Sequence, residues 1–465
     1  MRTTPILLIL PFILSLAACA PFKPAPRPDG SALTPPSFSL ETETEERTST
    51  DRWWEEFQSP ELNTLVNRAL SNNFDLRQAR ARLDQARATA RKSGADLLPT
   101  LTGSADGSET RYRNEGGPTM QSGDYSLGLA ASYEIDLWGR IRASRESDVL
   151  AMAATREDLN TAAITLAGEI STAWVNLLSN RARQSLIRNQ LKTNRTTLEL
   201  LELRFDNSLS TAVDVLQQRT TVARTKASLP PLEAEEQVLL HKLAILTGQP
   251  ATSVPQITRA ALPEPIPLPA TGIPADLLVK RPDIRSAGLS LKAADWEVSA
   301  AQANRMPALS LTGSAEYSGD EINLLFSNWA ANLAGSLTGP IFDGNRRRAE
   351  VDRTLAVARE KLAAYEETVY TALQDVEDAL INERKQRTYI AASEVQLAAA
   401  KEALGAAREQ YLNGVENYLT VLSNLLSVQS LEQNLIIRRA ELLNYRIELY
   451  RALGGTWTDT LSPQL

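Results

Sequence analysis

Residues 140–205 have the sequence RIRASRESDVLAMAATREDLNTAAITLAGEISTAWVNLLSNRARQSLIRNQLKTNRTTLELLELRF. They include no proline and one glycine, Gly168, and strong helix formers dominate them. A single helix of this length is about 100 Å long, roughly three times the hydrocarbon core of a bilayer. Residues 345–412 show the same pattern, with Gly405 as the only glycine. Because such helices are too long for an ordinary globular domain, the sequence predicts two long helical rods.

The two rods belong to an internal duplication of the chain. We predict repeat 1 at residues 60–248 and repeat 2 at residues 275–454, with a stiff linker at 249–274 that contains seven prolines. Residues 455–465 form a tail. Landmarks recur in the same order 206 to 210 residues apart: Phe74–Arg77 with Pro282–Arg285, Leu101–Ala105 with Leu311–Ala315, Phe205–Ser208 with Tyr411–Gly414, and Leu246–Gly248 with Ala452–Gly454.

Each repeat follows the same plan. A first helix, at 75–97 and 283–305, leads into two strand-like segments, and the rod follows. After a turn comes a second long helix, at 211–246 in repeat 1 and 416–453 in repeat 2. Pro230-Pro231 should kink the repeat 1 copy, because proline lacks the amide hydrogen that a helix needs.

Residues 1–18 have the features of a signal peptide, and Leu16-Ala17-Ala18-Cys19 looks like a bacterial lipobox. We expect Cys19 to carry a diacylglycerol and an N-acyl chain such as palmitate, with Ala20 implying sorting to the outer membrane. The alternative is an ordinary signal peptide and a free buried cysteine. Residues 19–59 form a tether, in which Trp53-Trp54 is either a ligand platform or a contact that packs the tether onto the body.

The two strand-like regions, at about 99–138 and 307–342, alternate apolar and polar residues. Leu127, Leu129, Leu309 and Leu311 share one parity, whereas serine, threonine and asparagine dominate the other. No element of the sequence obviously covers the apolar face, so we expect it to face lipid while the polar face lines a wet lumen. The alternative is a soluble β-domain whose apolar face meets a core.

Four strands cannot close a barrel, and open strand edges cannot lie in lipid. Two chains would give eight strands and an interior filled by side chains, whereas three chains would give twelve strands and a water-filled lumen. The predicted fold class is therefore mainly α with a transmembrane β part, in which a duplicated helix–hairpin–helix unit forms a trimeric 12-stranded barrel continued by a long α-helical barrel. The rod of repeat 2 also carries a 3-4 spaced seam that a plain coiled-coil dimer would share: Leu355, Ala358, Leu362, Tyr365, Val369, Ala372, Val376 and Ala379.

Composition excludes several classes of function. The net charge of −7 disfavours nucleic-acid binding. One histidine (His241) and one cysteine cannot build a Ser-His-Asp triad, a His-rich zinc site or a thiol enzyme, and no phosphate-binding loop of the Walker type occurs. We therefore expect no enzyme activity, metal or cofactor, and expect any energy for transport to come from a partner.

Together with the lipobox, Trp53-Trp54 and the duplicated plan, the motif YLNGVENYL at Tyr411–Leu419 resembles the outer-membrane efflux proteins. These are the TolC-like channel components of Gram-negative tripartite pumps, and the OprM-like lipoprotein branch is the most similar. The resemblance implies a homotrimer in outer-membrane lipid, with its helical part in the periplasm. It also implies a periplasmic adaptor (a membrane fusion protein) and an inner-membrane pump, for which we expect the RND type.

In that family the tunnel closes at its periplasmic tip, near the turns that correspond here to 206–214 and 413–419. The resemblance makes Glu416, Asp214 and Tyr418 the candidate gate residues. Thr420 and Ser423 stand where the TolC branch has aspartates, which favours an OprM-like gate. The alternative for Glu416 is a solvated carboxylate that the helix dipole favours.

The predicted function is a passive, tip-gated exit duct for drugs or other small toxic solutes. Its rival is a lipid-anchored periplasmic coiled-coil scaffold. Within transport, metal-ion efflux and type I secretion remain alternatives, and the sequence does not name the substrate.

Overall fold

The computed structural model describes residues 21–27, 33–39, 52–253, 255–265, 268–269, 271 and 273–460. The predicted signal peptide and Cys19 lie outside these residues. The chain divides into two compact units. Unit 1 contains Ala81–Arg156 and Arg285–Glu367 with part of the N-terminal segment, and unit 2 contains Gly30–Arg80, Glu157–Ile284 and Thr368–Leu465.

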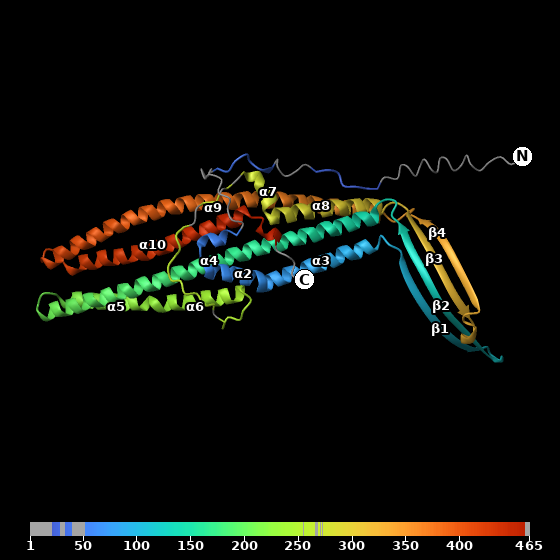
Figure 1. Ribbon diagram of the computed structural model, residues 1–465, viewed down its shortest axis with the longest axis horizontal. Coiled ribbons are helices and arrows are strands. Elements are labelled where there is room, and N and C mark those ends of the chain that lie inside the picture. Colours follow the sequence, from blue (N-terminus) through green and yellow to red (C-terminus); the bar gives the residue numbers. More distant parts are fainter. Residues whose placement is uncertain are drawn as a thin grey trace. The chain divides into compact units, whose positions relative to one another are not determined.

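Unit 1 contains a single antiparallel sheet of four strands in the order β1-β2-β3-β4 (Figure 1). Its central pairing, β2 with β3, joins the two repeats through a register that includes Leu129 opposite Ala315. The strands fall inside the two predicted hairpin regions: β1 (Thr100–Arg113), β2 (Thr119–Ile135), β3 (Ala308–Gly319) and β4 (Asn328–Thr338).

The register places all odd-numbered strand residues on one face of the sheet. On that face large side chains lie opposite small ones, such as Leu129 opposite Gly103 and Leu333 opposite Gly313. This pairing lets leucine side chains lie flat over a neighbouring strand. The predicted alternation therefore yields a face that is apolar along most of the sheet and turns polar at the far end of β1 and β2, where Glu109, Arg111 and Gln121 lie on it.

The rods are α4 (Arg140–Asp206) and α9 (Arg346–Leu412), each 67 residues long and 206 residues apart. They match the predicted ranges 140–205 and 345–412 to within one residue. Gly139 and Asn345, with φ of 78° and 66°, immediately precede the two helices. The two repeats therefore have a left-handed residue at the same position, immediately before each rod.

The second helices differ between the repeats. In repeat 2, α10 (Tyr418–Leu453) is continuous, whereas repeat 1 has α5 (Ala212–Ala227) and α6 (Leu229–Leu246), separated at Ser228. The predicted interruption at Pro230-Pro231 is one of hydrogen bonding: both prolines lie in the first turn of α6, while Ser228 keeps helical φ and ψ of −78° and −11° and donates its N–H to the Arg224 backbone oxygen. The predicted helix starts at 211 and 416 were early, because Thr211 and Asn417 are the N-caps.

The remaining helices are shorter. In repeat 1, α2 (Pro60–Asn72) and α3 (Phe74–Ala95) precede the sheet, and in repeat 2 α7 (Leu277–Lys280) and α8 (Pro282–Ala303) do so. None of the described helices has both the length and the apolarity of a membrane-spanning helix. Short 3-10 turns occupy Trp53–Phe57, Pro274–Asp276, Ile322–Leu324 and Trp457–Thr460.

An aromatic cluster in unit 2 joins the N-terminal and C-terminal segments. Trp53 stacks on Tyr450 with ring centroids 5.5 Å apart, and Trp54 meets Trp457 edge-on at 4.9 Å. Both tryptophans of the pair are buried. They pack the chain onto the helices, as the packing interpretation of Trp53-Trp54 predicts.

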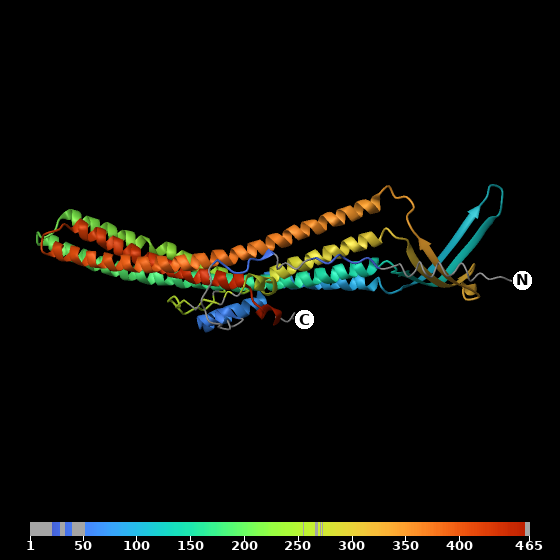
Figure 2. The same ribbon diagram turned by 90° about the horizontal axis from the view of Figure 1, so that it is seen from above.

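In unit 2 the α4–α5 and α9–α10 helix pairs run beside each other (Figure 2). The predicted seam of α9 is largely buried at Ala358, Val369, Ala372, Val376 and Ala379, whereas Leu355 is exposed.

Candidate functional site

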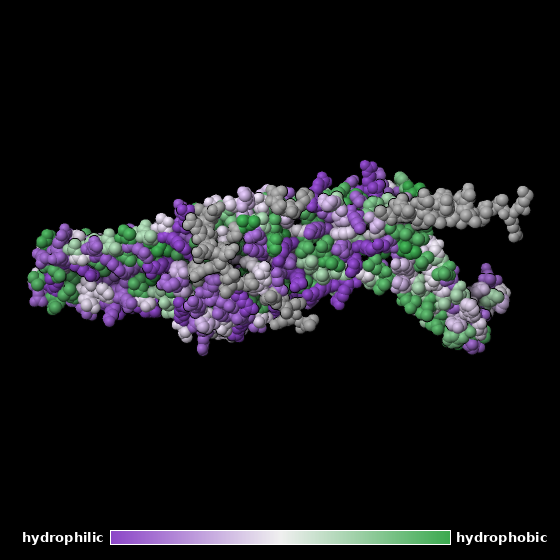
Figure 3. Space-filling model, turned by 45° about the horizontal axis from the view of Figure 1, so that its top comes forward, coloured by the Kyte–Doolittle hydropathy of each residue, from purple (hydrophilic) through white to green (hydrophobic). Residues whose placement is uncertain are grey.

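The sheet of unit 1 has no covering layer among the described residues. β1 and β4 are exposed along their whole length, and the exposed fractions of Leu101, Leu333 and Trp329 are 72%, 84% and 72%. The space-filling view shows apolar surface over the strands and polar surface at the far hairpin (Figure 3). An uncovered apolar face of this size marks a surface that meets lipid or another chain.

The opposite face of the sheet is polar and acidic. Its even-numbered positions carry Asp106, Asp124, Glu134 and Glu316, and no strand places a lysine or arginine there. The outer edges of β1 and β4 have no strand partner within the described chain. Unpaired edges on a sheet with one apolar and one polar face are what a barrel shared between chains requires.

The turns at 207–211 and 413–417, with the adjoining helix ends, form a region of unit 2 that we call the tip. Ser208 and Gly414 hold matching left-handed conformations with φ of 61° and 73°. The next residue in each turn donates its backbone N–H to the helix, Leu209 to Arg204 at 2.8 Å and Val415 to Gln410 at 2.9 Å. Both turns therefore end their rods with the same Schellman-like geometry.

Two of the candidate gate residues are helix-start carboxylates. Asp214 closes a capping box: its carboxylate accepts the Thr211 backbone N–H at 2.9 Å, and its own N–H donates to the Thr211 hydroxyl. Glu416 is half-buried just before the N-cap of α10 and accepts a hydrogen bond from the Thr420 hydroxyl at 3.0 Å. Within one chain these carboxylates thus help to start α5 and α10.

Tyr418, the third candidate, lies inside the core of the tip. Its side chain is 2% exposed, and its hydroxyl donates to Gln218 Oε1 at 2.7 Å. Burial, reinforced by Tyr411 and Asp214, raises the pKa of the Tyr418 hydroxyl far above its ordinary value, so the proton that it donates is retained. Tyr418 therefore ties α10 of repeat 2 to α5 of repeat 1.

Further hydrogen bonds from side-chain amides connect the same helices farther from the tip in unit 2. Gln218 donates to the Asn194 backbone oxygen at 2.7 Å, and Gln429 donates to the Asn194 side chain at 2.9 Å. Gln433 donates to Gln190 at 3.0 Å. Sequence reasoning missed these residues, although amides one helical turn apart, as at Gln190 and Asn194, are a signal of a polar seam between helices.

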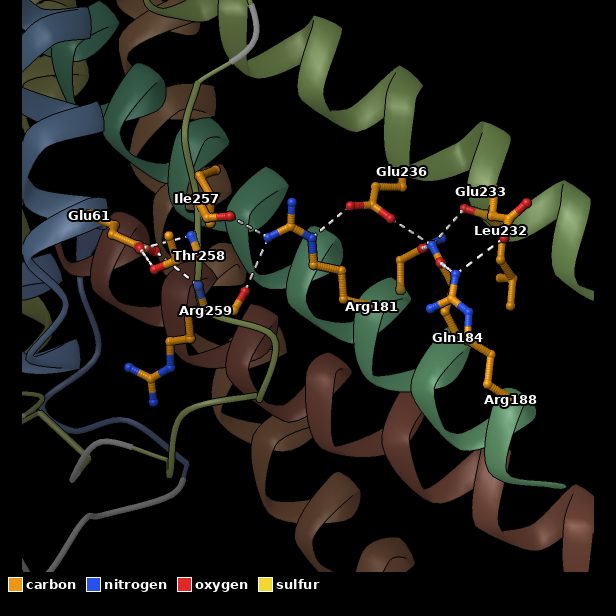
Figure 4. A network of polar contacts seen from close by, with 11 residues as sticks. Glu61, Arg181, Gln184, Arg188, Leu232, Glu233, Glu236, Ile257, Thr258 and Arg259 are labelled. Carbon is orange, nitrogen blue, oxygen red and sulfur yellow. Dashed lines mark hydrogen bonds and ion pairs between the residues drawn. The ribbon is translucent and has the colours of Figure 1, made fainter. Parts of the chain in front are cut away.

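The linker between the repeats is fixed to the helices of repeat 1 (Figure 4). Arg181 donates to Glu236 at 2.7 Å and to the Ile257 backbone oxygen at 2.6 Å. Glu61 accepts the Thr258 backbone N–H at 2.9 Å. Burial acts to raise the pKa of Glu61, but hydrogen bonds from Thr258 and Arg259 hold that pKa below its ordinary value.

Each repeat pins its second helix to its rod by the same two contacts. In repeat 1, Asn180 donates to Glu235 at 2.9 Å and Arg188 pairs with Glu233 at 3.1 Å. In repeat 2, 206 residues later, Gln386 donates to Glu441 at 2.9 Å and Arg439 pairs with Glu394 at 2.8 Å. The ion pair keeps its place but exchanges its charges. We call each set of two contacts the clamp of its repeat.

The residues that the structure describes contain no group of three or more His, Cys, Asp or Glu side chains arranged as metal ligands.

The sequence pattern of the family described as "Outer membrane efflux protein" matches residues 65–249 and 273–455, which are the two repeats. The chain belongs to this family. Its two matched segments coincide closely with the duplicated halves seen in the structure.

Similar outer membrane efflux proteins match between 80% and 97% of this chain. The "Pyoverdine export outer membrane protein OpmQ" of Pseudomonas aeruginosa is 32% identical over 452 residues, which cover 96% of this chain and 95% of OpmQ. The Pseudomonas putida protein of the same name is 34% identical, with 80% and 81% covered. The "Antibiotic efflux pump outer membrane protein ArpC" of Pseudomonas putida is 29% identical, with 97% and 95% covered.

Solved structures share the fold. The outer-membrane channel OprN superposes with a TM-score of 0.83 at 30% identity, covering 94% of this chain and 98% of OprN. The open state of the Neisseria gonorrhoeae MtrE outer membrane channel gives 0.84 at 27% identity, with 93% and 98% covered. The predicted fold class and outer-membrane location are confirmed, and the function is that of an efflux channel rather than a periplasmic scaffold. The roles of Cys19, Glu416, Asp214 and Tyr418 stay predictions.

Proposed function

We propose that three copies of this efflux channel share one 12-stranded barrel and one helical tunnel, which together form a passive duct that closes at the tip. The free edges of β1 and β4 support the shared barrel, because lipid offers no hydrogen-bond partner to an open edge. The acidic even-numbered face would then line the lumen. Passage through such a duct does not require any covalent bond to be made or broken. The duct only has to open and to present a lining that solutes can pass.

The observation that carries the gate is the buried contact between Tyr418 and Gln218. It crosses from repeat 2 to repeat 1 at the tip, where the two turns end the rods. Around the trimer axis three such contacts would hold the helix pairs together, and three copies of Glu416 and Asp214 would add negative charge at the constriction. Opening the tip would require these contacts to break.

The test replaces Tyr418 by Phe, which leaves Gln218 Oε1 without its donor. The neighbouring Tyr411 supplies the matched control: its ring lies 5.6 Å from that of Tyr418, but its buried hydroxyl has no hydrogen-bond partner among the described residues. In planar bilayers we expect Tyr418→Phe to raise single-channel conductance several-fold and Tyr411→Phe to leave it unchanged.

The Glu416→Ala variant should also raise single-channel conductance if the carboxylate ring helps to close the tip. Unchanged conductance in both Tyr418→Phe and Glu416→Ala contradicts a gate here.

The partners follow from the tip and from the sequence. Four apolar side chains are exposed at the tip, which favours a protein contact there: Leu209, Val213, Val415 and Leu419. A periplasmic adaptor fits this surface, and an RND-type pump in the inner membrane would supply the energy. Lipids on Cys19 would anchor the chain to the outer membrane.

The names of the relatives favour small organic solutes as cargo. They include proteins named for pyoverdine export, toluene efflux and antibiotic efflux. Drugs or other small toxic solutes therefore remain the proposed substrates.

A further inference from the structure

The two free edges of the sheet are staggered, because the outer strands do not begin and end at the same level. A row of paired residues runs across the four strands from Thr100 to Ala334, and β4 continues past this row through residues 335–338. At the other end of the sheet β4 begins at Asn328, whereas β1 continues past the row of Asn328 through residues 107–113. Each outer strand therefore projects where the other is absent.

A ring of three identical chains joins unlike edges, so β4 of one chain meets β1 of the next. With no shift between chains, Ala334 would face Thr100 of the next chain, and residues 335–338 would have no partner. A shift of four residues sets Thr338 opposite this Thr100, and a shift of seven sets Asn328 opposite Arg113 of the next chain. All 11 residues of β4 gain a partner only within these limits. Because odd-numbered residues must stay on the apolar face, only the even shifts of four and six remain.

Both even shifts give an ordinary barrel, but the two barrels differ in width. Around three chains the shifts accumulate to strand tilts of about 35° for four residues and about 45° for six. The larger shift also widens the barrel, to about 27 Å between opposite backbones instead of about 23 Å. The polar face accepts either shift, since Asn332 would meet Asp106 or Ser108 of the next chain. The apolar face must therefore decide the width of the duct.

The glycines of the apolar face distinguish the two shifts. Every odd-numbered glycine of the four strands lies opposite larger side chains and never opposite another glycine: Gly103–Leu129, Gly107–Tyr125, Gly123–Glu109, Gly313–Ala131, Gly313–Leu333, Gly319–Tyr125 and Gly335–Leu311. A shift of four would set Gly335 opposite Gly103 of the next chain, a pair without side chains to pack. A shift of six instead sets Leu337 opposite this Gly103. It also sets Leu333 opposite Gly107 of the next chain.

Trp329 favours the same shift. The shift of six sets Trp329 opposite Arg111 of the next chain, and a guanidinium is attracted to the negative face of an indole ring. The shift of four would set it opposite Glu109, whose carboxylate that face repels. Within one chain both Trp329 and Arg111 are exposed. The ion pair between Arg111 and Glu109, at 3.4 Å, is also exposed and therefore opposes this contact only weakly.

We propose that β4 pairs with β1 of the next chain after a shift of six residues. Leucines of β4 then cover glycines of β1 at each of the three interfaces, and Trp329 covers Arg111. This register fixes the wider of the two barrels, with about 27 Å between opposite backbones. The inference rests on the proposed shared barrel and specifies how its chains join.

The test cross-links cysteine pairs in isolated outer membranes with dibromobimane, a short reagent that joins two thiols. Opposite residues of paired strands have Cβ atoms about 5 Å apart, and diagonal neighbours are about 7 Å apart. Leu337→Cys/Gly103→Cys tests the shift of six, and Leu337→Cys/Leu101→Cys is the matched pair for the shift of four. We expect the first pair to form covalent trimers at least about tenfold faster than the second.

Two control variants calibrate this comparison. Leu337→Cys alone reports any link made through Cys19, the only cysteine of the unaltered chain. Leu333→Cys/Gly313→Cys places two thiols opposite each other within one chain, in a register that the structure gives, and so sets the rate for an opposite pair.

The outcomes separate the register from the shared barrel. Faster linkage of Leu337→Cys/Leu101→Cys, or no linkage of either pair in intact trimers, overturns the proposed register and leaves the shared barrel standing. If native mass spectrometry of the unaltered chain shows no trimer, the shared barrel is wrong and the register with it. Leu333→Cys/Gly107→Cys and Leu333→Cys/Ala105→Cys repeat the comparison at a second leucine, so the result does not depend on the assembly of one variant.

Discussion

Repeat 1 and repeat 2 place equivalent clamps at matching positions, yet they build the helix beyond the clamp differently. In repeat 2 the clamp leads into a continuous helix with a largely apolar buried face, whereas in repeat 1 it leads to two prolines and the sparsely anchored α5. The two copies of a duplicated helix can therefore be anchored unequally. The α10 copy buries a largely apolar face, and the α5 copy buries fewer apolar side chains.

The repeats also differ at a pair of buried positions close to the clamps. In repeat 2, Arg446 and Glu383 form an ion pair at 2.6 Å, with 1% and 3% of their side chains exposed. Burial lowers the pKa of the Arg446 guanidinium, and the Glu383 carboxylate opposes that shift. The matching positions in repeat 1 are Leu240 and Leu177, both buried. Repeat 1 therefore contains an apolar version of this site, in which two leucines stand in place of the ion pair.

This difference predicts the largest effect. Arg446→Leu alone leaves the Glu383 carboxylate buried with only Arg387 to compensate it, and should lower the free energy of unfolding by about 3–5 kcal/mol. Glu383→Leu/Arg446→Leu copies repeat 1 and should recover most or all of that loss. Urea denaturation of the trimers measures both. A double variant no more stable than the single one would mean that the two repeats are packed differently here.

Much of this comparison could be read from the sequence, and some of it could not. The rods and the alternation of the strands are local patterns, so residues 140–205 and 127–135 were enough to predict them. Pro230-Pro231 predicted the interruption of the helical hydrogen bonds for the same reason. The ties around Gln218 and Asn194 depend on which helices meet, which the pattern of one helix does not specify. Tyr418 was named by resemblance, but the sequence did not identify Gln218 as its partner.

A second prediction tests the unequal anchoring of α5 and α10. Leu425 lies in the buried cluster of the tip, whereas the matching residue of α5 is the exposed Arg219, which pairs with Glu202 at 2.6 Å. Leu425→Ala should cost about 3 kcal/mol, because it loses apolar burial and leaves a cavity. Arg219→Ala should cost less than about 1 kcal/mol, because exposed ion pairs are weak. Thermal unfolding of the two trimers gives the comparison, and similar losses would show that α5 is anchored as firmly as α10.

The smallest expected effect concerns the clamps, where the repeats carry the same ion pair with opposite polarity. Arg188→Glu places two carboxylates next to each other and removes the donor that Gln184 accepts, so it should destabilise the trimer by up to about 1 kcal/mol. Arg188→Glu/Glu233→Arg gives repeat 1 the polarity of Arg439 and Glu394 and should restore most of that loss. Salt sharpens the test, because screening at high ionic strength should reduce the cost of the single variant and leave the double variant almost unchanged. A double variant no more stable than the single one would mean that the loss comes from the missing Arg188–Gln184 hydrogen bond, which both variants share, and not from the charge on α6.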